Sequence, residues 1–444
     1  GSSEGAGAVS ISFASLGISP DFAGVLQALG FNEPSPIQKL ALGPTLEGRD
    51  ALIQSQSGTG KTSMLAMLCV ALSERERAGV TSAQAVPTTS INSYKAEAPA
   101  SSSPPPSPSS KVVAVVLSPS RELAVQTRNM VNRLGYSLDV HCHALTGGKT
   151  VKSDREALSK AKVLSGTPGR TLQLLRTSDE SVFAGVKILF VDEVDEIVSE
   201  GFNNILLSIK DRLPASVQVV LTSATMTPDV RDMCEKITQD PVKLLTKPED
   251  LAQSGIKQYF VRMSAEDEEE RIILCVKLYE RLRSLQTIIF ANTISTVKTL
   301  YRRFKNRGAA VGMMHREVSQ KERDSTLADF KAQRLMLLVT TDVWARGIDV
   351  QSVMATINFD LPFAPETYLH RVGRAGRFYG KGLAISLVSP KDKSQFAEIQ
   401  TRYALKIPEL PVKFRQNDPA ISEKEYHMGQ LARENWLRGK RKHR

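Results

Sequence analysis

The sequence predicts an α/β protein with two doubly wound parallel-sheet domains in tandem. The chain has 444 residues, which is long for one domain and suits two. Its short apolar runs are nearly continuous rather than alternating, as expected for strands of a parallel sheet buried on both faces. Amphipathic segments such as Thr62–Leu72 and Arg121–Leu134 separate these runs and give the βαβ rhythm of an open α/β fold.

The expected strands fall into two series. The first series is Ala51–Gln54, Val112–Leu117, Lys162–Gly166, Lys187–Val191 and Val217–Thr222. The second series is Gln258–Val261, Thr287–Phe290, Met336–Thr340, Met354–Ile357 and Leu383–Val388. The pattern lapses at 246–257, which we interpret as a linker between an N-terminal domain, 1–245, and a C-terminal domain, 258–412.

Two further segments do not fit the α/β rhythm. Residues 78–110 are rich in Ala, Ser, Thr and Pro and predict a disordered surface insertion, either a tolerated loop or a docking or phosphorylation segment. Residues 413–444 form a basic tail, which three hypotheses fit: a solvated arm, an RNA anchor or a nuclear-import signal.

Composition narrows the class of partner. The net charge of +11 favours a polyanion, with nucleic acid ahead of an acidic membrane surface. No run approaches the roughly 18 apolar residues of a membrane span, so we expect no membrane partner. The sequence His141-Cys142-His143 lacks a second ligand pair nearby, which disfavours a zinc site. The scattered cysteines predict neither a disulfide framework nor a C-x-x-C site: Cys69, Cys142, Cys234 and Cys275.

The N-terminus lacks a signal-peptide pattern, and Lys39 is its first basic side chain. We therefore expect an intracellular protein of the cytoplasm or the nucleus. The chain opens on Gly1-Ser2-Ser3 without Met, so an organelle stays open if a targeting segment has been removed.

A phosphate-binding loop follows the first expected strand. The string Ser55–Thr62 combines a Gly-rich turn with Lys and Thr and leads into a helix, which is the arrangement that encloses a triphosphate. Gly58 and Gly60 let backbone N–H groups approach phosphates, Lys61 should reach the β- and γ-phosphates, and Thr62 should bind Mg²⁺. The predicted phosphate ligands are Ser57, Gly58, Thr59, Gly60, Lys61 and Thr62. The alternative is a Gly-rich turn with an incidental lysine.

An acidic string, Asp192-Glu193-Val194-Asp195, follows the strand Lys187–Val191. Carboxylates at the carboxyl end of a central parallel strand face the ligand crevice of such a fold. We expect Asp192 to hold Mg²⁺, largely through water, and Glu193 to activate the water that attacks the γ-phosphate. A solvated acidic loop is the alternative, which the phosphate loop in the same chain disfavours.

With both motifs present, the chain resembles the DEAD-box ATP-dependent RNA helicases from about Phe13 to Leu410. It is most similar to the group around translation initiation factor four-A and its exon-junction relative, on the strings Asp342–Gly347 and Gly255–Phe260. The resemblance implies that both domains are RecA-like. It departs at Val194, where the family carries Ala, and at Arg316, where the family carries Gly after His. The further matching strings are Gly30–Gln38, Ser118–Ala124, Gly147-Gly148, Thr167–Arg170, Ser223–Thr225, Phe290–Thr293, Gln320 with Arg323, Thr341–Asp349 and His370–Arg377.

The resemblance also implies roles for residues at these positions. Phe31 and Gln38 would recognise adenine, Asp349 the ribose, and Arg374 and Arg377 would act as arginine fingers beside Glu193, Asp192 and Lys61. The implied RNA contacts are Pro119, Arg121, Gly147, Gly148, Thr167, Arg170, Arg323 and Thr341. The implied coupling residues are Asp195, Ser223, Thr225 and His370.

The implied function is an RNA-dependent ATPase and ATP-dependent RNA helicase that remodels RNA locally by closing its two lobes. Its cofactors would be ATP and Mg²⁺, and its RNA would be bound without strong sequence preference. We expect a protein activator or a ribonucleoprotein complex, and a monomer outside that complex. Two alternatives stay open: a slow-turnover, ATP-locked RNA clamp that acts as a scaffold, and a motor on DNA or protein.

Overall fold

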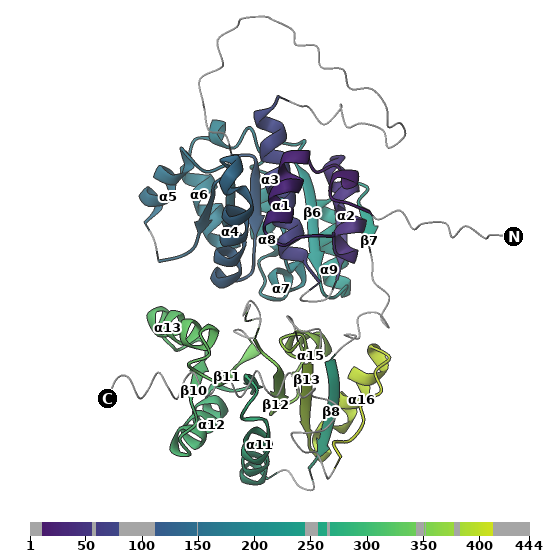
Figure 1. The fold of residues 1–444 in the computed structure, drawn as a ribbon, viewed down its shortest axis with the longest axis vertical. Coiled ribbons are helices and arrows are strands. Elements are labelled where there is room, and N and C mark those ends of the chain that lie inside the picture. Colours follow the sequence, from purple (N-terminus) through teal and green to yellow (C-terminus); the bar gives the residue numbers. More distant parts are fainter. Residues whose placement is uncertain are drawn as a thin grey trace, which may run out of the picture. The chain divides into compact units, whose positions relative to one another are not determined.

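The computed structural model describes residues 11–55, 59–79, 112–148, 150–244, 256–263, 267–342, 350, 352–376 and 382–411. These residues form two compact units, one before and one after the predicted linker (Figure 1). Most of the predicted insertion and linker and all of the basic tail lie outside the described residues. Each unit is an α/β domain by itself.

The first unit contains a seven-stranded sheet in the order β3-β4-β2-β5-β6-β1-β7, and every described pair in it is parallel. Its strands are β1 (Ala51–Gln54), β2 (Ala114–Leu117), β3 (Cys142–Leu145), β4 (Val163–Gly166), β5 (Ile188–Val191), β6 (Gln218–Ser223) and β7 (Val242–Leu244). The five predicted strands are confirmed. The two edge strands, β3 and β7, were not predicted.

The helices of the first unit are α1 (Pro20–Ala28), α2 (Pro36–Leu46), α3 (Lys61–Arg77), α4 (Arg121–Gly135), α5 (Val151–Leu158), α6 (Pro168–Thr177), α7 (Val194–Ser199), α8 (Asn203–Lys210) and α9 (Pro228–Ile237), with 3-10 turns at Ala14–Leu16, Tyr136–Leu138 and Glu180–Val182. Successive strand residues enter opposite cores. Phe190 of β5 packs with α1 to α4, whereas Leu189 and Val191 pack with α6 to α9. Burial on both faces explains the continuous apolar runs.

The second unit contains a six-stranded parallel sheet in the order β10-β11-β9-β12-β13-β8. Its strands are β8 (Ile256–Arg262), β9 (Thr287–Phe290), β10 (Val311–Met314), β11 (Leu337–Thr340), β12 (Ala355–Asn358) and β13 (Gly382–Val388). Its helices are α11 (Glu268–Leu282), α12 (Ile294–Asn306), α13 (Gln320–Lys331), α15 (Pro365–Val372) and α16 (Lys393–Arg402), with a 3-10 turn at Pro390–Asp392. The edge strand β10 was not predicted, and β8 begins at Ile256, inside the segment that we interpreted as linker.

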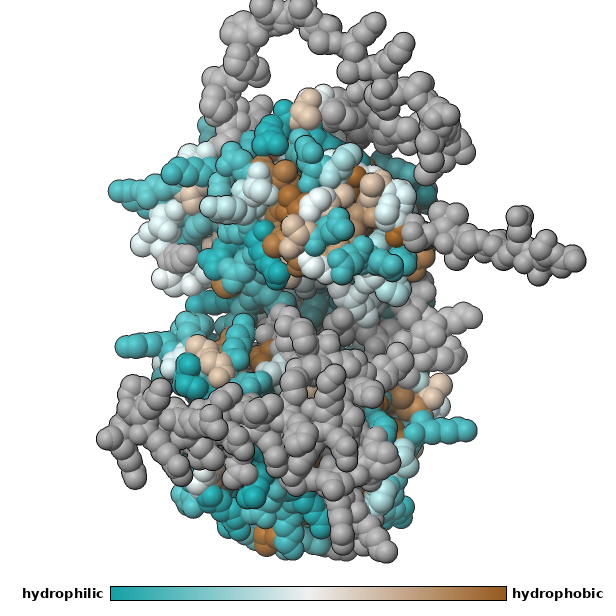
Figure 2. Space-filling model, in the orientation of Figure 1, coloured by the Kyte–Doolittle hydropathy of each residue, from teal (hydrophilic) through white to brown (hydrophobic). Residues whose placement is uncertain are grey.

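Most of the predicted motifs follow strand ends, so in each unit these motifs gather at the carboxyl ends of the strands, where open α/β sheets bind ligands. The visible faces of the described parts are mainly hydrophilic, with small apolar patches (Figure 2). Among the described residues, no helix combines the length and the apolar character that crossing a bilayer requires.

Candidate ATP and RNA sites

The phosphate loop connects β1 to α3, and its described end is already tied to the strand. Gly60 has φ 98° and leads into α3, which begins at Lys61. Lys61 is buried, and its Nζ donates to the carbonyl oxygen of Ser55 at 2.5 Å. The amino end of α3 presents N–H groups and a positive dipole, which favour a phosphate. Thr62 lies in the first turn of the same helix, while Ser57 and Gly58 lie outside the described residues.

The start of α2 contacts this loop directly. Ser35 and Gln38 form a capping box, in which the Gln38 Oε1 accepts from the Ser35 backbone N at 2.9 Å. The Gln38 Nε2 donates to Ser63 Oγ at 2.9 Å, and Ser35 Oγ donates to the Thr59 carbonyl at 3.1 Å. A Cβ at Gly60 would lie 3.1 Å from Ser35 Oγ and 3.2 Å from Gln38 Nε2, so glycine is needed there for space as well as for its positive φ. Gln38 is therefore coupled to the phosphate loop.

Phe31, the other residue predicted to recognise adenine, lies just before α2. Its ring is half-buried and packs against the core that α1 to α4 share. This contact fixes the ring beside the helix that carries Gln38, whose side-chain amide is predicted to recognise adenine.

The carboxylates after β5 are buried together. Glu193 adopts a left-handed backbone, with φ 52° and ψ 54°, which is strained for a residue other than glycine. Its N–H donates to Thr222 Oγ1 at 3.2 Å, and that hydroxyl donates to Asp192 Oδ1 at 2.5 Å. Burial raises the pKa of Asp192 to about 6, the Glu193 charge adds to the shift, and Lys61 and Thr222 oppose it. Thr222 was not predicted, because nothing local marks it.

One atom of this cluster awaits a partner. The Glu193 Oε2 is buried and has no hydrogen-bond partner among the described residues. Buried carboxylate oxygens are costly to leave unpaired, so this position favours a water or ligand.

The third carboxylate joins the acidic string to the segment after β6. Asp195 Oδ2 accepts from the Thr225 backbone N at 3.2 Å and from Thr225 Oγ1 at 2.9 Å. Ser223 Oγ donates to the Thr225 carbonyl at 2.6 Å. Val194 points away from these groups into the core shared by α6 to α9, where it is fully buried. Its replacement of Ala is therefore a matter of packing.

Three predicted RNA contacts of the first unit, Arg121, Gly147 and Gly148, lie against one another. A Cβ on Gly147 would lie 2.3 Å from Arg121 Nη2, and one on Gly148 would lie 3.6 Å from Arg121 Nη1. The guanidinium therefore rests on the two glycines, a position that larger residues would not permit. Pro119 lies half-buried before α4, and Thr167 is the N-cap of α6.

Arg170 is held by a buried carboxylate that was not predicted. Its Nε and Nη2 lie 2.8 and 2.6 Å from Asp154 Oδ2, and His143 Nε2 lies 2.9 Å from the other oxygen. Asp154 is fully buried. Its signal in the sequence was weak, because Asp154 stands on an ordinary amphipathic helix.

In the second unit, Arg323 on α13 reaches back to the loop after β10. Its Nη2 donates to the Arg316 carbonyl at 2.7 Å and its Nη1 approaches Gln320 Oε1 at 3.4 Å. The Thr341 N–H donates to the Met314 carbonyl at 3.3 Å, next to the same loop. These two predicted RNA contacts thus occupy one edge.

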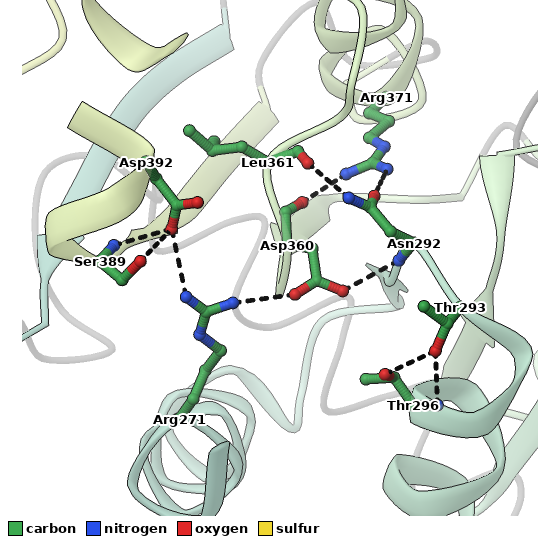
Figure 3. Close-up of polar contacts among 9 residues, drawn as sticks. All are labelled: Arg271, Asn292, Thr293, Thr296, Asp360, Leu361, Arg371, Ser389 and Asp392. Carbon is green, nitrogen blue, oxygen red and sulfur yellow. Dashed lines mark hydrogen bonds and ion pairs between the residues drawn. The ribbon is translucent and has the colours of Figure 1, made fainter. Parts of the chain in front are cut away.

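Figure 3 shows a network around Arg371, which was not predicted as a site residue. Arg371 has no exposed surface, and its Nε and Nη2 lie 2.5 and 2.6 Å from the two oxygens of Asp342. It also donates to Asn292 Oδ1 at 2.7 Å and to the Asp360 carbonyl at 2.5 Å. The Asn292 N–H donates to Asp360 Oδ2 at 2.9 Å, and Arg271 Nη1 donates to Asp360 Oδ1 at 2.9 Å. Arg371 therefore joins the segments that follow β9, β11 and β12.

The helix α15 also carries His370, and Arg374 follows its end. Both side chains are buried, and Arg374 Nε donates to the His370 carbonyl at 3.1 Å. The predicted residues Asp349 and Arg377 lie outside the described residues.

Two family models match the chain: DEAD/DEAH box helicase over residues 35–233 and Helicase conserved C-terminal domain over residues 270–379. ATP-dependent RNA helicase FAL1 of Candida albicans is 38% identical over 401 residues, which cover 90% of this chain and 92% of the relative. Eukaryotic initiation factor 4A-3 of Nicotiana plumbaginifolia is 39% identical over 402 residues, which cover 90% of this chain and 94% of the relative. This chain belongs to the DEAD-box RNA helicases.

Solved structures agree with this assignment. Dbp5 of S. cerevisiae bound to RNA and ADP BeF3 superposes with a TM-score of 0.76 at 28% identity, covering 95% of this chain and 99% of that chain. The L327V variant of the same yeast protein, bound to gle1 h337r and ip6, gives a TM-score of 0.68 at 28% identity, covering 97% of this chain and 100% of that chain.

Membership in the family confirms the predicted resemblance, including the likeness to the initiation factor four-A group. The helicase hydrolyses ATP and acts on RNA, and its two α/β units are the RecA-like pair of the family. The roles of individual residues are argued below from the geometry.

Proposed function

We propose that the first unit binds ATP with Mg²⁺ and that Glu193 is the general base for the attacking water. The observation that carries this proposal is the buried Oε2 of Glu193, which has no hydrogen-bond partner within the described part of the chain and lies on a strained backbone beside Asp192. Lys61 is positioned at the same strand ends to bind the β- and γ-phosphates, and its charge acts on Asp192.

The residues present fit a magnesium ion. The Asp192 carboxylate and the Thr62 hydroxyl offer oxygen ligands, which this hard cation prefers. When bound, Mg²⁺ would supply positive charge that neutralises the negative charge developing on the phosphate oxygens during hydrolysis. The hydrogen bond from Thr222 holds one oxygen of the Asp192 carboxylate in place. The same bond therefore fixes the direction of the second carboxylate oxygen.

The remaining nucleotide contacts are assigned by motif and supported by local geometry. Gln38 and Phe31 recognise adenine, and Gln38 is linked to the helix that follows the phosphate loop by its hydrogen bond to Ser63. Asp349 binds the ribose, and Arg374 and Arg377 of the C-terminal domain stabilise the transition-state charge. Because these arginines belong to the other domain, hydrolysis requires the two domains to close.

RNA binds along the carboxyl ends of the strands of both sheets. The protein contacts the phosphates and 2′-hydroxyls of the RNA rather than its bases, so recognition is independent of sequence. Its proposed contacts are Pro119, Arg121, Gly147, Gly148, Thr167, Arg170, Arg323 and Thr341. Asp195, Ser223, Thr225 and His370 couple hydrolysis to domain closure. The Asp195–Thr225 bonds support this role, because they connect the acidic string to the segment after β6.

The test is Glu193→Gln in the full chain, which keeps size and hydrogen bonding but removes the base. We expect RNA-stimulated ATP hydrolysis to fall by at least about 100-fold, a loss typical of a missing general base. ATP-dependent RNA retention should be intact or stronger. The matched control is Glu235→Gln on α9, an exposed glutamate that should leave turnover unchanged. Near-normal turnover of Glu193→Gln would exclude the proposed base.

Active remodelling is favoured over the slow clamp. Val194, one of the two departures from the family, lies in the core and leaves the carboxylates unobstructed. Multiple-turnover ATPase with and without RNA separates the two modes.

We also propose a first domain over 1–245 and a second domain up to 412, with the linker shortened to 246–255 because β8 begins at Ile256. We further propose a protein activator or ribonucleoprotein partner, and a monomer outside that complex. The structure of Dbp5 bound to gle1 supports a protein partner for this related chain. We also propose that the protein acts in the cytoplasm or the nucleus.

A further inference from the structure

The loop after β10 presents an arginine at the proposed RNA edge of the second unit. β10 is the edge strand of its sheet, and His315, Arg316 and Glu317 follow its carboxyl end. His315 is buried, whereas the Arg316 side chain is exposed. The loop is thus anchored on one side and open to ligands on the other.

Arg323 donates hydrogen bonds to two backbone carbonyls of this loop. Its Nη2 lies 2.7 Å from the Arg316 carbonyl and 3.4 Å from the His315 carbonyl. The guanidinium predicted to bind RNA is therefore directed at the backbone of the loop, and it fixes where the Arg316 Cα sits. Ordering a long side chain on a fixed backbone costs less entropy on binding.

The acidic groups around the loop are already engaged. Glu317 pairs with Lys298 at 2.8 Å, Glu322 accepts from Ser319 Oγ at 2.6 Å, and Asp324 accepts from Gln320 Nε2 at 3.0 Å. Among the described residues, no carboxylate forms an ion pair with Arg316. Its charge is available to a phosphate.

We propose that Arg316 binds a phosphate of the RNA strand and adds a contact on the second unit. The proposal rests on the RNA path given above through Arg323 and Thr341. A guanidinium presents a planar fork of donors that matches two phosphate oxygens, and an exposed one is not already neutralised. Arg316 thus increases affinity without reading bases.

The experiment measures binding of full-length protein to a single-stranded oligouridylate by fluorescence anisotropy, with a non-hydrolysable ATP analogue and Mg²⁺, across a KCl series. Loss of one phosphate contact lowers the slope of log affinity against log salt by about 0.7. The ratio of the RNA affinity of the parent protein to that of Arg316→Gln should therefore fall by about 2.6-fold between about 50 and 200 mM KCl. Arg316→Lys should keep the slope, because it keeps the charge.

The matched control is Arg283→Gln. Arg283 is an exposed arginine that precedes β9, so it lies at the amino ends of the strands of the same sheet, away from their carboxyl ends. Its replacement should leave both the salt slope and the RNA affinity unchanged. The proposal is overturned if Arg316→Gln binds with the slope of the parent, or if Arg283→Gln lowers the slope equally. Failure of the RNA path itself would look different: the parent protein would show no salt dependence, and Arg323→Ala would bind RNA as the parent does.

Discussion

Replacement of Arg371 by lysine should weaken the contacts that join the segments after β9, β11 and β12. The arginine reaches three acceptors at once: the Asp342 carboxylate, Asn292 Oδ1 and the Asp360 carbonyl. A lysine has one nitrogen, so it can keep the ion pair with Asp342 but leaves the other two acceptors without this donor. Both are half-buried, so we take the low end of the penalty, about 1 kcal/mol each. The expected cost is about 2 kcal/mol.

Hydrogen exchange followed by mass spectrometry measures this cost in the full chain, because local opening is read from individual peptides. Amides of β9 and α15 should lose about 30-fold in protection, which is about 2 kcal/mol. The control is Arg303→Lys: Arg303 also contacts a carboxylate, Glu269 at 2.5 Å, but the pair is exposed and contributes little. Unchanged protection in Arg371→Lys, or an equal loss in the control, would refute the reasoning.

Two further outcomes follow from the first unit. Because burial raises the pKa of Asp192 to about 6, its charged form is lost as pH falls through that value, so Mg²⁺-dependent nucleotide binding should weaken below about pH 6. Fluorescent-nucleotide titrations with and without Mg²⁺ check this, and an equal decline in both would contradict it. Thr225→Val removes the hydroxyl bond to Asp195, a charged acceptor, and should lower the stability of this unit by about 1.5–3 kcal/mol. Chemical denaturation measures this loss of stability, and an unchanged denaturation midpoint would contradict the prediction. In the same variant, RNA-stimulated ATPase activity should fall more than the affinity for ATP.

The interior strands could be predicted from sequence because both of their faces are buried. β5 places Ile188 and Phe190 in one core and Leu189 and Val191 in the other, so all its residues are apolar. Three of the four edge strands lack this signal; the fourth, β8, was predicted. β7 carries the exposed Lys243, and β10 contains Gly312, a residue that weakens strand propensity. These two strands, and β3 with its half-exposed His143, were therefore missed.

The site motifs could be predicted because each is a short string in which neighbours in sequence act together. Their supports could not, because they come from distant segments. Thr222 is 30 residues from Asp192, and Asp342 is 29 residues from Arg371. Arg371 and Asp342 both stood inside recognised strings but received no role, since a string does not reveal which side chains face inward.

Neighbouring acceptors divide the arginines of these motifs into two kinds. Arg170 and Arg371 are paired with Asp154 and Asp342, so much of their charge is neutralised before any ligand arrives. Arg121 rests on glycines, and among the described residues neither it nor Arg316 forms an ion pair with a carboxylate. A paired guanidinium must be separated from its carboxylate before it gains full attraction to a phosphate, whereas an unpaired one gains it directly. We infer that unpaired arginines set the salt-dependent affinity for RNA, and that the paired ones shape the loops on which the strand lies.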